Sequence, residues 1–253
     1  MSHIANSNIR VDNFQYRQQD KTRYIYFLSH CHEDHLRGLS NNWNHGKIYM
    51  SHLSKKLITD RYPGLRNFVV DLEMDEEHWI YLDESKKEGV QVVLVDAFHC
   101  PGAVMFLFKG KMGTVLHTGD FRFSEAMFDN EWLCPPERRN AKMQGISVEV
   151  DYLHLDNTFA NPEYDFPSRE EAYQGLVNIV KSHMEYRVFL FSYNLGKEEV
   201  FLNLAEDFKC KIVVDEDRYK KIRLMDLKPE LFTTDPSASR IHIRSIRDLK
   251  AHE

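Results

Sequence analysis

Residues 23–35 read RYIYFLSHCHEDH, an apolar run joined directly to a polar one. The first part, Arg23 to Ser29, is compact, aromatic and β-branched, which is typical of a buried strand. The polar part places three histidines and an aspartate within six positions: His30, His32, Asp34 and His35. Zinc favours these groups as ligands. A solvated loop or the first turn of a helix is the alternative, but so dense a set of ligands directly after a strand favours a metal site.

Two later segments repeat the pattern. His99 follows the predicted strand 90–96 and precedes a Pro-Gly turn. Asp120 follows the predicted strand 113–118 and a glycine. A lone histidine is more often structural, and an aspartate after a glycine is ordinarily a turn residue. Three strand ends that present ligands are a different case, because strand ends at one rim of a sheet converge. We therefore expect one metal site from His30, His32, His99 and Asp120, and a second from Asp34, His35 and a bridging Asp120.

The rest of the first half predicts further strands at 47–50, 104–108 and 151–155. The segment Lys109 to Met112 predicts the turn between strands 104–108 and 113–118, with Gly110 supplying the bend. The acidic residues from Asp71 to Glu77 predict a solvated loop. This half therefore predicts a strand-rich unit whose strand ends carry the candidate ligands.

The second half predicts alternating helices and strands. Ser168 and the acidic residues after it are an N-terminal capping pattern for a helix. A strand at 187–192, a helix at 197–208, a strand at 211–214 and a helix near 218–225 follow. This alternation predicts an α/β module. Two prolines interrupt the pattern between Asn161 and Pro167, so we divide the chain into domains 1–160 and 161–253.

Composition narrows the class of protein. The net charge of −6 argues against a protein that coats nucleic acid through bulk charge, although an enzyme can still bind a few phosphates locally. The four cysteines have no paired spacing, which favours reduced thiols in a cytosolic or nuclear protein. No apolar run approaches the length of a membrane span, and the N-terminus has no signal-peptide core. We therefore expect no membrane partner.

The motif series resembles that of the metallo-β-lactamase superfamily: HxHxDH at 30–35, then a lone histidine, then TGDFR at 118–122. Within that superfamily the chain resembles the Apollo and Artemis family of DNA nucleases, most closely its Apollo branch. The specific matches are HCPGAVMFLF at 99–108, LDNT at 155–158 and SYNLGKEE at 192–199. The resemblance implies an αββα sandwich for the first domain, with an inserted α/β domain of the β-CASP type, and a site holding one or two zinc ions.

The resemblance also implies roles for single residues. Asp12 matches an aspartate that supports the ligand loop without binding metal. Asp34, Asp120 and His242 are the candidate catalytic residues, with Asp34 orienting the attacking water and His242 assisting at the phosphate. Substrate contacts are expected from residues of the LDNT, SYNLGKEE and β-CASP motifs: Asp156, Thr158, Ser192 and Lys197.

The activity that the resemblance implies is 5′-to-3′ digestion of DNA carrying a 5′-phosphate, in nuclear DNA repair or telomere-end processing, with recruiting protein partners not visible in this chain. An RNA-processing β-CASP endonuclease is the first alternative, since zinc hydrolysis does not discriminate sugars. A small-molecule hydrolase such as a thioesterase is disfavoured by the GKE element and the inserted domain. The basic stretch from Arg218 to Arg223 suits phosphate contacts and base stacking, or equally a solvated helix face.

The chain departs from the family in one respect. Relatives continue into a segment that returns to the first domain and supplies another histidine in a Ser-x-His-Ser-Ser context, and this sequence ends at Glu253 without it. The expectation is a fragment of a longer protein, or an incomplete second metal site in a sandwich that lacks its last strands. A non-catalytic zinc-binding scaffold is therefore a further alternative.

Overall fold

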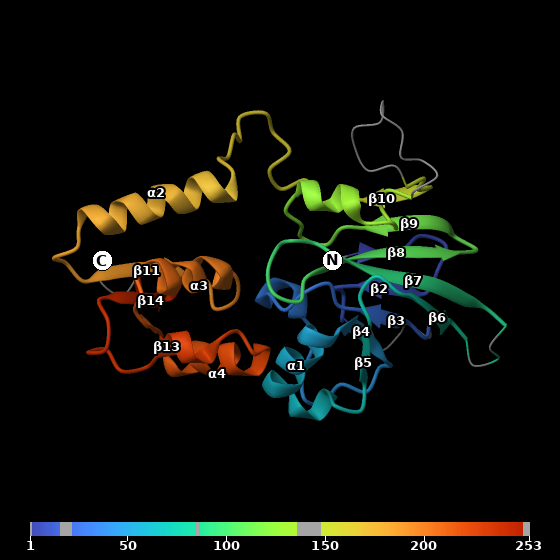
Figure 1. Cartoon of the computed structure of the whole chain (residues 1–253). Helices are drawn as coiled ribbons and strands as arrows, with labels where there is room; N and C mark the ends of the chain where they lie inside the picture. The colour runs from blue at the N-terminus through green and yellow to red at the C-terminus, as the bar shows by residue number, and fades with distance from the viewer. Residues whose placement is uncertain (1, 16–21, 84, 86, 136–147, 250–253) are drawn as a thin grey trace. The chain divides into compact units, whose positions relative to one another are not determined.

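The computed structural model describes residues 2–15, 22–83, 85, 87–135 and 148–249. These residues fold into two compact units, Met1–Asp156 and Asn157–Glu253 (Figure 1). Both units combine helices with sheets, so the predicted α/β class is confirmed. Among the described residues, no helix has the length and apolar character needed to cross a bilayer.

The first unit contains two five-stranded sheets. In the first sheet, β1 pairs antiparallel with β2, and the remaining strands are parallel neighbours. Its strands, in spatial order, are β1 (Ser2–His3), β2 (Ile9–Val11), β3 (Ile25–Phe27), β4 (Ile48–Ser51) and β5 (Val69–Leu72). The strand predicted at 23–29 is observed as β3 at the centre of this sheet, where Tyr26 and Phe27 are buried on opposite faces.

The second sheet is mainly antiparallel. Its strands, in spatial order, are β10 (Tyr152–His154), β9 (Gly113–His117), β8 (Val104–Gly110), β7 (Gly89–Asp96) and β6 (Glu77–Tyr81). The predicted turn is displaced, because Gly110 pairs with Gly113 and only Lys111 and Met112 connect the strands. The backbone in the left-handed region belongs to Gly113, at φ 89°, and not to Gly110. Lys111 and Met112 do not have positive φ, so the connection is not a primed two-residue turn. A left-handed glycine directly after the bend is typical of a type I turn followed by a bulge.

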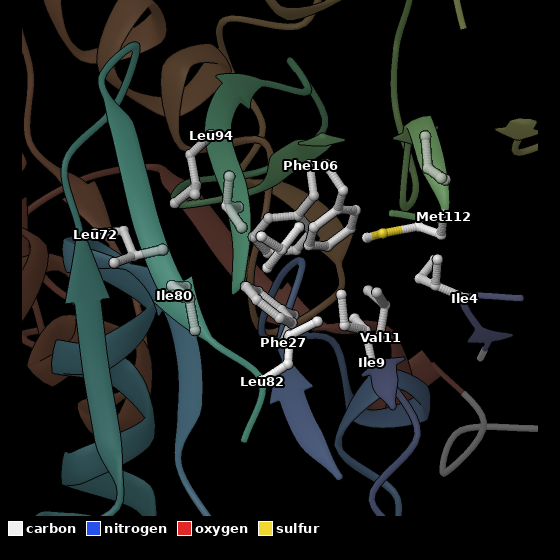
Figure 2. Packing of buried hydrophobic residues seen from close by; sticks show 14 of the residues in the cluster. Ile4, Ile9, Val11, Phe27, Leu72, Ile80, Leu82, Leu94, Phe106 and Met112 are labelled. Atoms are coloured by element: carbon white, nitrogen blue, oxygen red, sulfur yellow. The ribbon is translucent and has the colours of Figure 1, made fainter. Parts of the chain in front are cut away.

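The core of the first unit lies between the two sheets. Phe27 packs edge-on against Phe106 and Phe108, with ring centroids 5.2 and 4.9 Å apart. Figure 2 shows these buried side chains meeting side chains from β2 and the strands around them. Alternate residues of β7 point into this core (Val92, Leu94) and out of it (Val93, Val95), and both sets are buried. A strand buried on both faces requires the continuous apolar run seen in the sequence.

The outer face of each sheet is also covered. Over the first sheet lie α1 (His52–Arg61), η1 (Glu33–Leu36) and η2 (Pro63–Leu65), which bury Ile58, Leu36 and Leu65 against Tyr26. Over the second lies η3 (Glu125–Asp129), whose Met127 joins the outer cluster. These layers are consistent with an αββα sandwich.

The prediction of a solvated loop at 71–77 was wrong at both ends of the range, whereas residues 73–76 are exposed and connect β5 to β6. Asp71 and Leu72 end β5, Met74 forms a bridge with Leu94, and Glu77 begins β6. Acidic residues suggested a loop, but Leu72 is buried in the core while Asp71 forms ion pairs with His52 and Lys55 at 2.7 and 2.6 Å. The charged side chains of Glu73, Asp75, Glu76 and Glu77 are exposed.

The second unit is a parallel sheet with helices. Its helical and strand elements, in chain order, are α2 (Arg169–Ser182), β11 (Val188–Ser192), α3 (Glu198–Asp207), β12 (Ile212–Val213), α4 (Glu216–Met225), η5 (Pro229–Leu231), β13 (Phe232–Thr233), β14 (Ile241–Ser245) and α5 (Ile246–Leu249). The sheet order is β11-β14-β12-β13, all parallel. The Ser168 capping box is present, because its hydroxyl accepts from Glu171 N at 3.1 Å and Glu171 accepts from Ser168 N at 2.8 Å.

Candidate metal centre

The candidate ligands of the first unit lie beyond the carboxyl ends of neighbouring strands. β7 and β9 both run antiparallel to β8, so they end at the same rim of the second sheet. The two sheets meet at this rim, where Val104 N donates a hydrogen bond to Ser29 O at 3.0 Å. His30 follows β3, His99 follows β7 and Asp120 follows β9. The topology therefore brings residues 69 and 90 positions apart in the sequence to one place.

Four predicted ligands meet there: their ligand atoms all lie within 4.8 Å of one another, in the set His30, His32, His99 and Asp120. His32 Nδ1 lies 3.0 Å from His30 Nε2 and 3.1 Å from His99 Nε2. Asp120 Oδ2 lies 3.8 and 3.7 Å from the same two Nε2 atoms. Ligands about 2.0–2.1 Å from a tetrahedral zinc are about 3.3–3.4 Å apart, which these separations bracket. The donor set and its spacing fit zinc.

The hydrogen bonds around His30 fix which ring nitrogen carries its proton. Ser29 Oγ donates to Asp12 Oδ2 at 2.6 Å, so its only hydrogen is used there. The contact of 2.9 Å between Ser29 Oγ and His30 Nδ1 then requires Nδ1 to be the donor. His30 Nε2 is therefore left with a lone pair that points toward the cluster. This arrangement orients a metal-binding histidine through a hydrogen bond on its other nitrogen.

Asp12 joins this network to His35. Its Oδ1 accepts from Ser29 N at 2.8 Å, and its Oδ2 lies 2.9 Å from His35 Nδ1. The carboxylate is 1% exposed and its backbone is left-handed, at φ 52°. Burial opposes its ionisation, but the hydrogen bond with His35 helps to hold the pKa of Asp12 below the ordinary value. Asp12 thus touches His35 and Ser29 rather than the four-ligand cluster.

The second predicted set is arranged around His35. Its Nε2 lies 3.2 Å from Asp120 Oδ1 and 3.5 Å from Asp34 Oδ2. The two oxygens of Asp120 therefore face different groups of imidazoles: Oδ1 faces His35, and Oδ2 faces His30 and His99. Asp34 is the most open of these groups, with 63% of its side chain exposed.

Burial and charge set different protonation states at the two sides. Desolvation by burial lowers the pKa of His30 to about 3 and also lowers that of His99. Both rings are neutral at pH 7, as metal ligands must be. Burial opposes protonation of His35 too, but hydrogen bonds with Asp12 and Asp120 outweigh it and raise its pKa to about 10. The hydrogen bond with His35 in turn lowers the pKa of Asp120.

Backbone contacts hold the loops that carry His99 and Asp120. Gly102 O, three residues after His99, accepts from Ser51 Oγ at 2.7 Å and Ser54 Oγ at 3.0 Å. On the other loop, Gly119 N donates to His117 Nδ1 at 3.1 Å. The N-terminus of α1 thereby fixes one ligand loop, and the end of β9 fixes the other.

Asp156 lies at the same rim, after β10. Its backbone N donates to Thr118 Oγ1 at 2.9 Å, and Thr118 Oγ1 lies 2.8 Å from Gly119 O. Its carboxylate, like that of Asp120, opposes the lowering of the His99 pKa. Asp156 is thus tied to the Asp120 loop.

Gly119→Ala is expected to destabilise the first unit by about 2–4 kcal/mol, from left-handed strain and overpacking together. Gly119 has φ 54°, and a Cβ there would lie 2.8 Å from Ser29 Cβ and 2.9 Å from Ser29 Oγ. The clash falls on the hydroxyl that orients His30. Chemical denaturation measures the loss.

The matched control for this variant is Gly175→Ala on α2, where an added Cβ meets nothing within 4 Å. It is expected to stabilise the helix by about 0.5–1 kcal/mol. A Gly119→Ala protein as stable as the parent would contradict the packing described for this loop.

The other predicted site residues belong to the second unit. Ser192 ends β11 and is 9% exposed, while Lys197 is exposed and adopts the left-handed conformation at the start of α3. His242, in β14, is 1% exposed, and its Nε2 donates to Ser239 O at 3.0 Å. Thr158 is exposed, two residues past Asp156. Their roles toward substrate stay predictions.

The sequence analysis did not identify the roles of two residues that contact predicted site residues, Ser29 and Arg218. Ser29 directly precedes the first ligand, and its contacts with Asp12 and His30 show that it orients the His30 ring. In the sequence, only its position at the end of the predicted strand could have indicated this role. Arg218 was expected in a basic stretch that either contacts phosphates and bases or forms a solvated helix face, but it is 3% exposed and contacts Ser192. The other cations of that stretch include Lys221, which pairs with Asp217 at 2.6 Å.

Comparison with curated proteins finds close similarity to DNA-processing proteins over nearly the whole chain. The chain is 40% identical over 240 residues to 5′ exonuclease Apollo of Danio rerio and 37% identical over 247 residues to that of Gallus gallus. These matches cover 95% and 98% of this chain. It is 35% identical over 248 residues to the human DNA cross-link repair 1A protein. The chain spans 40%, 50% and 22% of these three relatives, respectively.

A solved structure shares the fold. A protein of unknown function from Enterococcus faecalis V583 matches 91% of this chain and 60% of its own, with a TM-score of 0.57 and 16% identity. At this identity the match concerns the fold alone. No protein-family model matches the sequence.

Proposed function

The chain belongs to the family of the Apollo and DNA cross-link repair proteins, and on that premise we propose that it is a zinc-dependent nuclease. In its narrower form the proposal is a 5′-to-3′ exonuclease that digests DNA from 5′-phosphorylated ends, in nuclear DNA repair or telomere-end processing. The relatives named 5′ exonuclease Apollo support this activity by their similarity.

The observation that carries the proposal is the position of Asp120. His30, His32, His99 and Asp120 are called the tetrad below. Asp120 Oδ2 lies 3.8 Å from His30 Nε2 and 3.7 Å from His99 Nε2, and Asp120 Oδ1 lies 3.2 Å from His35 Nε2. A carboxylate shared in this way can bridge two cations, as in two-metal phosphodiesterases. His30, His32, His99 and Asp120 would hold the first zinc, and Asp34, His35 and Asp120 a second. His35, whose contacts with Asp12 and Asp120 favour its protonated form, would lose that proton when a cation binds.

Zinc bound in such a site supplies a nucleophile at neutral pH and stabilises negative charge on a phosphoryl oxygen. The chain's own residues would hold the reacting groups in place and move the proton. Asp34, exposed beside His35, would orient the attacking water and accept its proton. Ser29 and Asp12 would keep the lone pair of His30 directed at the cluster.

We propose the same architecture that the motifs imply: a metallo-β-lactamase domain at 1–160 and a β-CASP domain at 161–253. The layered first unit and the parallel sheet of the second unit support this proposal. His242 would act on the phosphate within it. Thr158, Ser192, Lys197 and Asp156 would contact the substrate.

The substrate proposal predicts faster digestion of 5′-phosphorylated single-stranded DNA than of the same strand with a 5′-hydroxyl. A terminal phosphate carries more charge than an internal diester, and charge-assisted hydrogen bonds are about twice as strong as neutral ones. Lys197→Ala is expected to reduce the preference for the phosphorylated end by about tenfold, with a smaller effect on the 5′-hydroxyl rate. Rates on both strands, measured with the full-length protein, provide the test.

Lys211→Ala is the matched control, because it removes another exposed lysine, which precedes β12 in the same unit. It is expected to leave the preference unchanged. Equal wild-type rates on the two ends, or a preference for RNA, would favour the RNA-processing endonuclease instead. A folded, zinc-loaded protein with no hydrolysis of either substrate would favour the scaffold.

A further inference from the structure

A buried arginine lies beneath the loop between β11 and α3. Arg218, on α4, is 3% exposed, and its guanidinium is 5.3 Å from the ring centroid of Phe201. One of its terminal nitrogens donates to Ser192 Oγ at 2.8 Å and also to Tyr193 O. The other lies 3.7 Å from Glu198 Oε1. An α4 side chain thus contacts the loop at its first residues and at its last.

Glu198 lies at the end of this loop, where α3 begins. Its side chain is 4% exposed, and its Oε1 accepts a hydrogen bond from Gly196 N at 2.9 Å. Gly196 and Lys197 both have positive φ, at 101° and 71°. Two successive left-handed residues turn the chain sharply into α3, and the Glu198 carboxylate closes this turn from inside.

Burying the ion pair between Arg218 and Glu198 costs free energy of solvation, so its presence calls for an explanation. Two charges lose hydration on burial, and a well-packed apolar pair of similar volume is often as stable or more stable. Arg218 instead donates hydrogen bonds to the Ser192 hydroxyl and to the backbone carbonyl of Tyr193 in the loop. These bonds fix the path of residues 192–198 more narrowly than apolar packing would, because each has a required direction.

We propose that Arg218 is a positioning residue for 5′-end recognition: it holds the loop 192–198 in the form that presents Lys197 to the terminal phosphate. This inference rests on the proposed function of that loop. Ser192 Oγ accepts from Arg218 and lies 3.2 Å from Tyr193 O, so the hydroxyl is bound within the loop's own network. Lys197, four residues after Tyr193, is exposed. Arg218 acts on the substrate only through these residues.

The test removes the guanidinium without leaving a lone buried carboxylate. In the double variant Arg218→Met with Glu198→Gln, the amide oxygen still accepts from Gly196 N, while the bonds to Ser192 and Tyr193 are lost. We expect the ratio of kcat/KM on 5′-phosphorylated over 5′-hydroxyl DNA to fall by about tenfold, mostly through KM. The 5′-hydroxyl rate should change little. Arg218→Lys, which keeps the charge but has its donors on a single nitrogen, should recover part of the ratio.

Hydrogen exchange provides a readout that needs no substrate. The amides of 193–197 should exchange faster in the double variant than in the parent, while those of α2 should not. Lys211→Met, which removes an exposed cation of the same unit, should alter neither the exchange nor the ratio. Unchanged exchange at 193–197, or an unchanged ratio despite faster exchange, would overturn the proposal for Arg218. Equal wild-type rates on the two DNA ends would instead refute the proposed 5′-phosphate function.

Discussion

Asp120→Asn is expected to abolish hydrolysis and to lower metal content at the same time. The carboxylate faces the tetrad nitrogens with one oxygen and His35 with the other, so the amide replaces one of the two oxygens with a group that cannot bind a cation. We expect a loss in kcat/KM of at least ~10³-fold, the upper end for a single stabilising group. Steady-state hydrolysis and elemental analysis of the same preparation measure both effects.

Asp34→Asn is the comparison for this variant. Asp34 is 63% exposed and lies near His35, outside the four-ligand set, so its loss should reduce hydrolysis strongly but metal content less. The fold should survive in both variants, because Asp120 is also partly exposed, at 35% of its side chain. Full activity of Asp34→Asn would remove that residue from the mechanism. Full metal content in Asp120→Asn would remove the bridging role.

His99→Ala is expected to lower zinc occupancy strongly. The purified protein should carry at least one tightly bound zinc per chain, because three imidazoles and a carboxylate complete a tetrahedral site. Loss of an outer hydrogen-bond partner of a zinc ligand lowers zinc affinity by about 10–100-fold. Loss of a ligand itself should therefore lower zinc affinity by more than roughly 100-fold. Competition with a chromophoric chelator measures the affinity, and circular dichroism reports whether the fold is kept.

His52→Ala is the control for zinc affinity. His52 is an exposed histidine on α1 whose ring contacts Asp71 at 2.7 Å rather than the tetrad. Its removal should leave zinc affinity unchanged. Protein without zinc, iron or manganese after metal-replete expression would refute the metal-centre proposal altogether.

Local pattern predicted the strands that are buried on both faces. The predicted strands 23–29, 90–96 and 104–108 each contain a continuous apolar run, and each run lies in a central strand of its sheet. The local pattern failed to predict strands that form only because they pair with a segment distant in the sequence. β5 and β6 carry acidic residues, and β13 has only two residues, so their pairing with neighbouring strands decided the outcome. Pairing energy of that kind is not visible in a local window.

The candidate ligands were identifiable from sequence because their residue types are rare in such density and follow predicted strands. The sequence could not supply the protonation state of each ring. Desolvation lowers the pKa of His30 to about 3, whereas contacts with two carboxylates raise that of His35 to about 10. The two histidines are five residues apart and differ only in what surrounds them.

The sequence by itself determined the α/β class, the buried strands and the residue types available to bind a metal, because hydrophobic period and ligand chemistry are local properties. The convergence of strand ends also predicted that His30, His32, His99 and Asp120 meet. Only the tertiary structure decided the detailed contacts around them. It directed both oxygens of Asp120 to different imidazoles and linked Asp12 to His30 through Ser29. It also turned Arg218 from a predicted surface cation into a buried contact of Ser192. Those outcomes depend on sheet order and burial, which arise only when distant segments pack together.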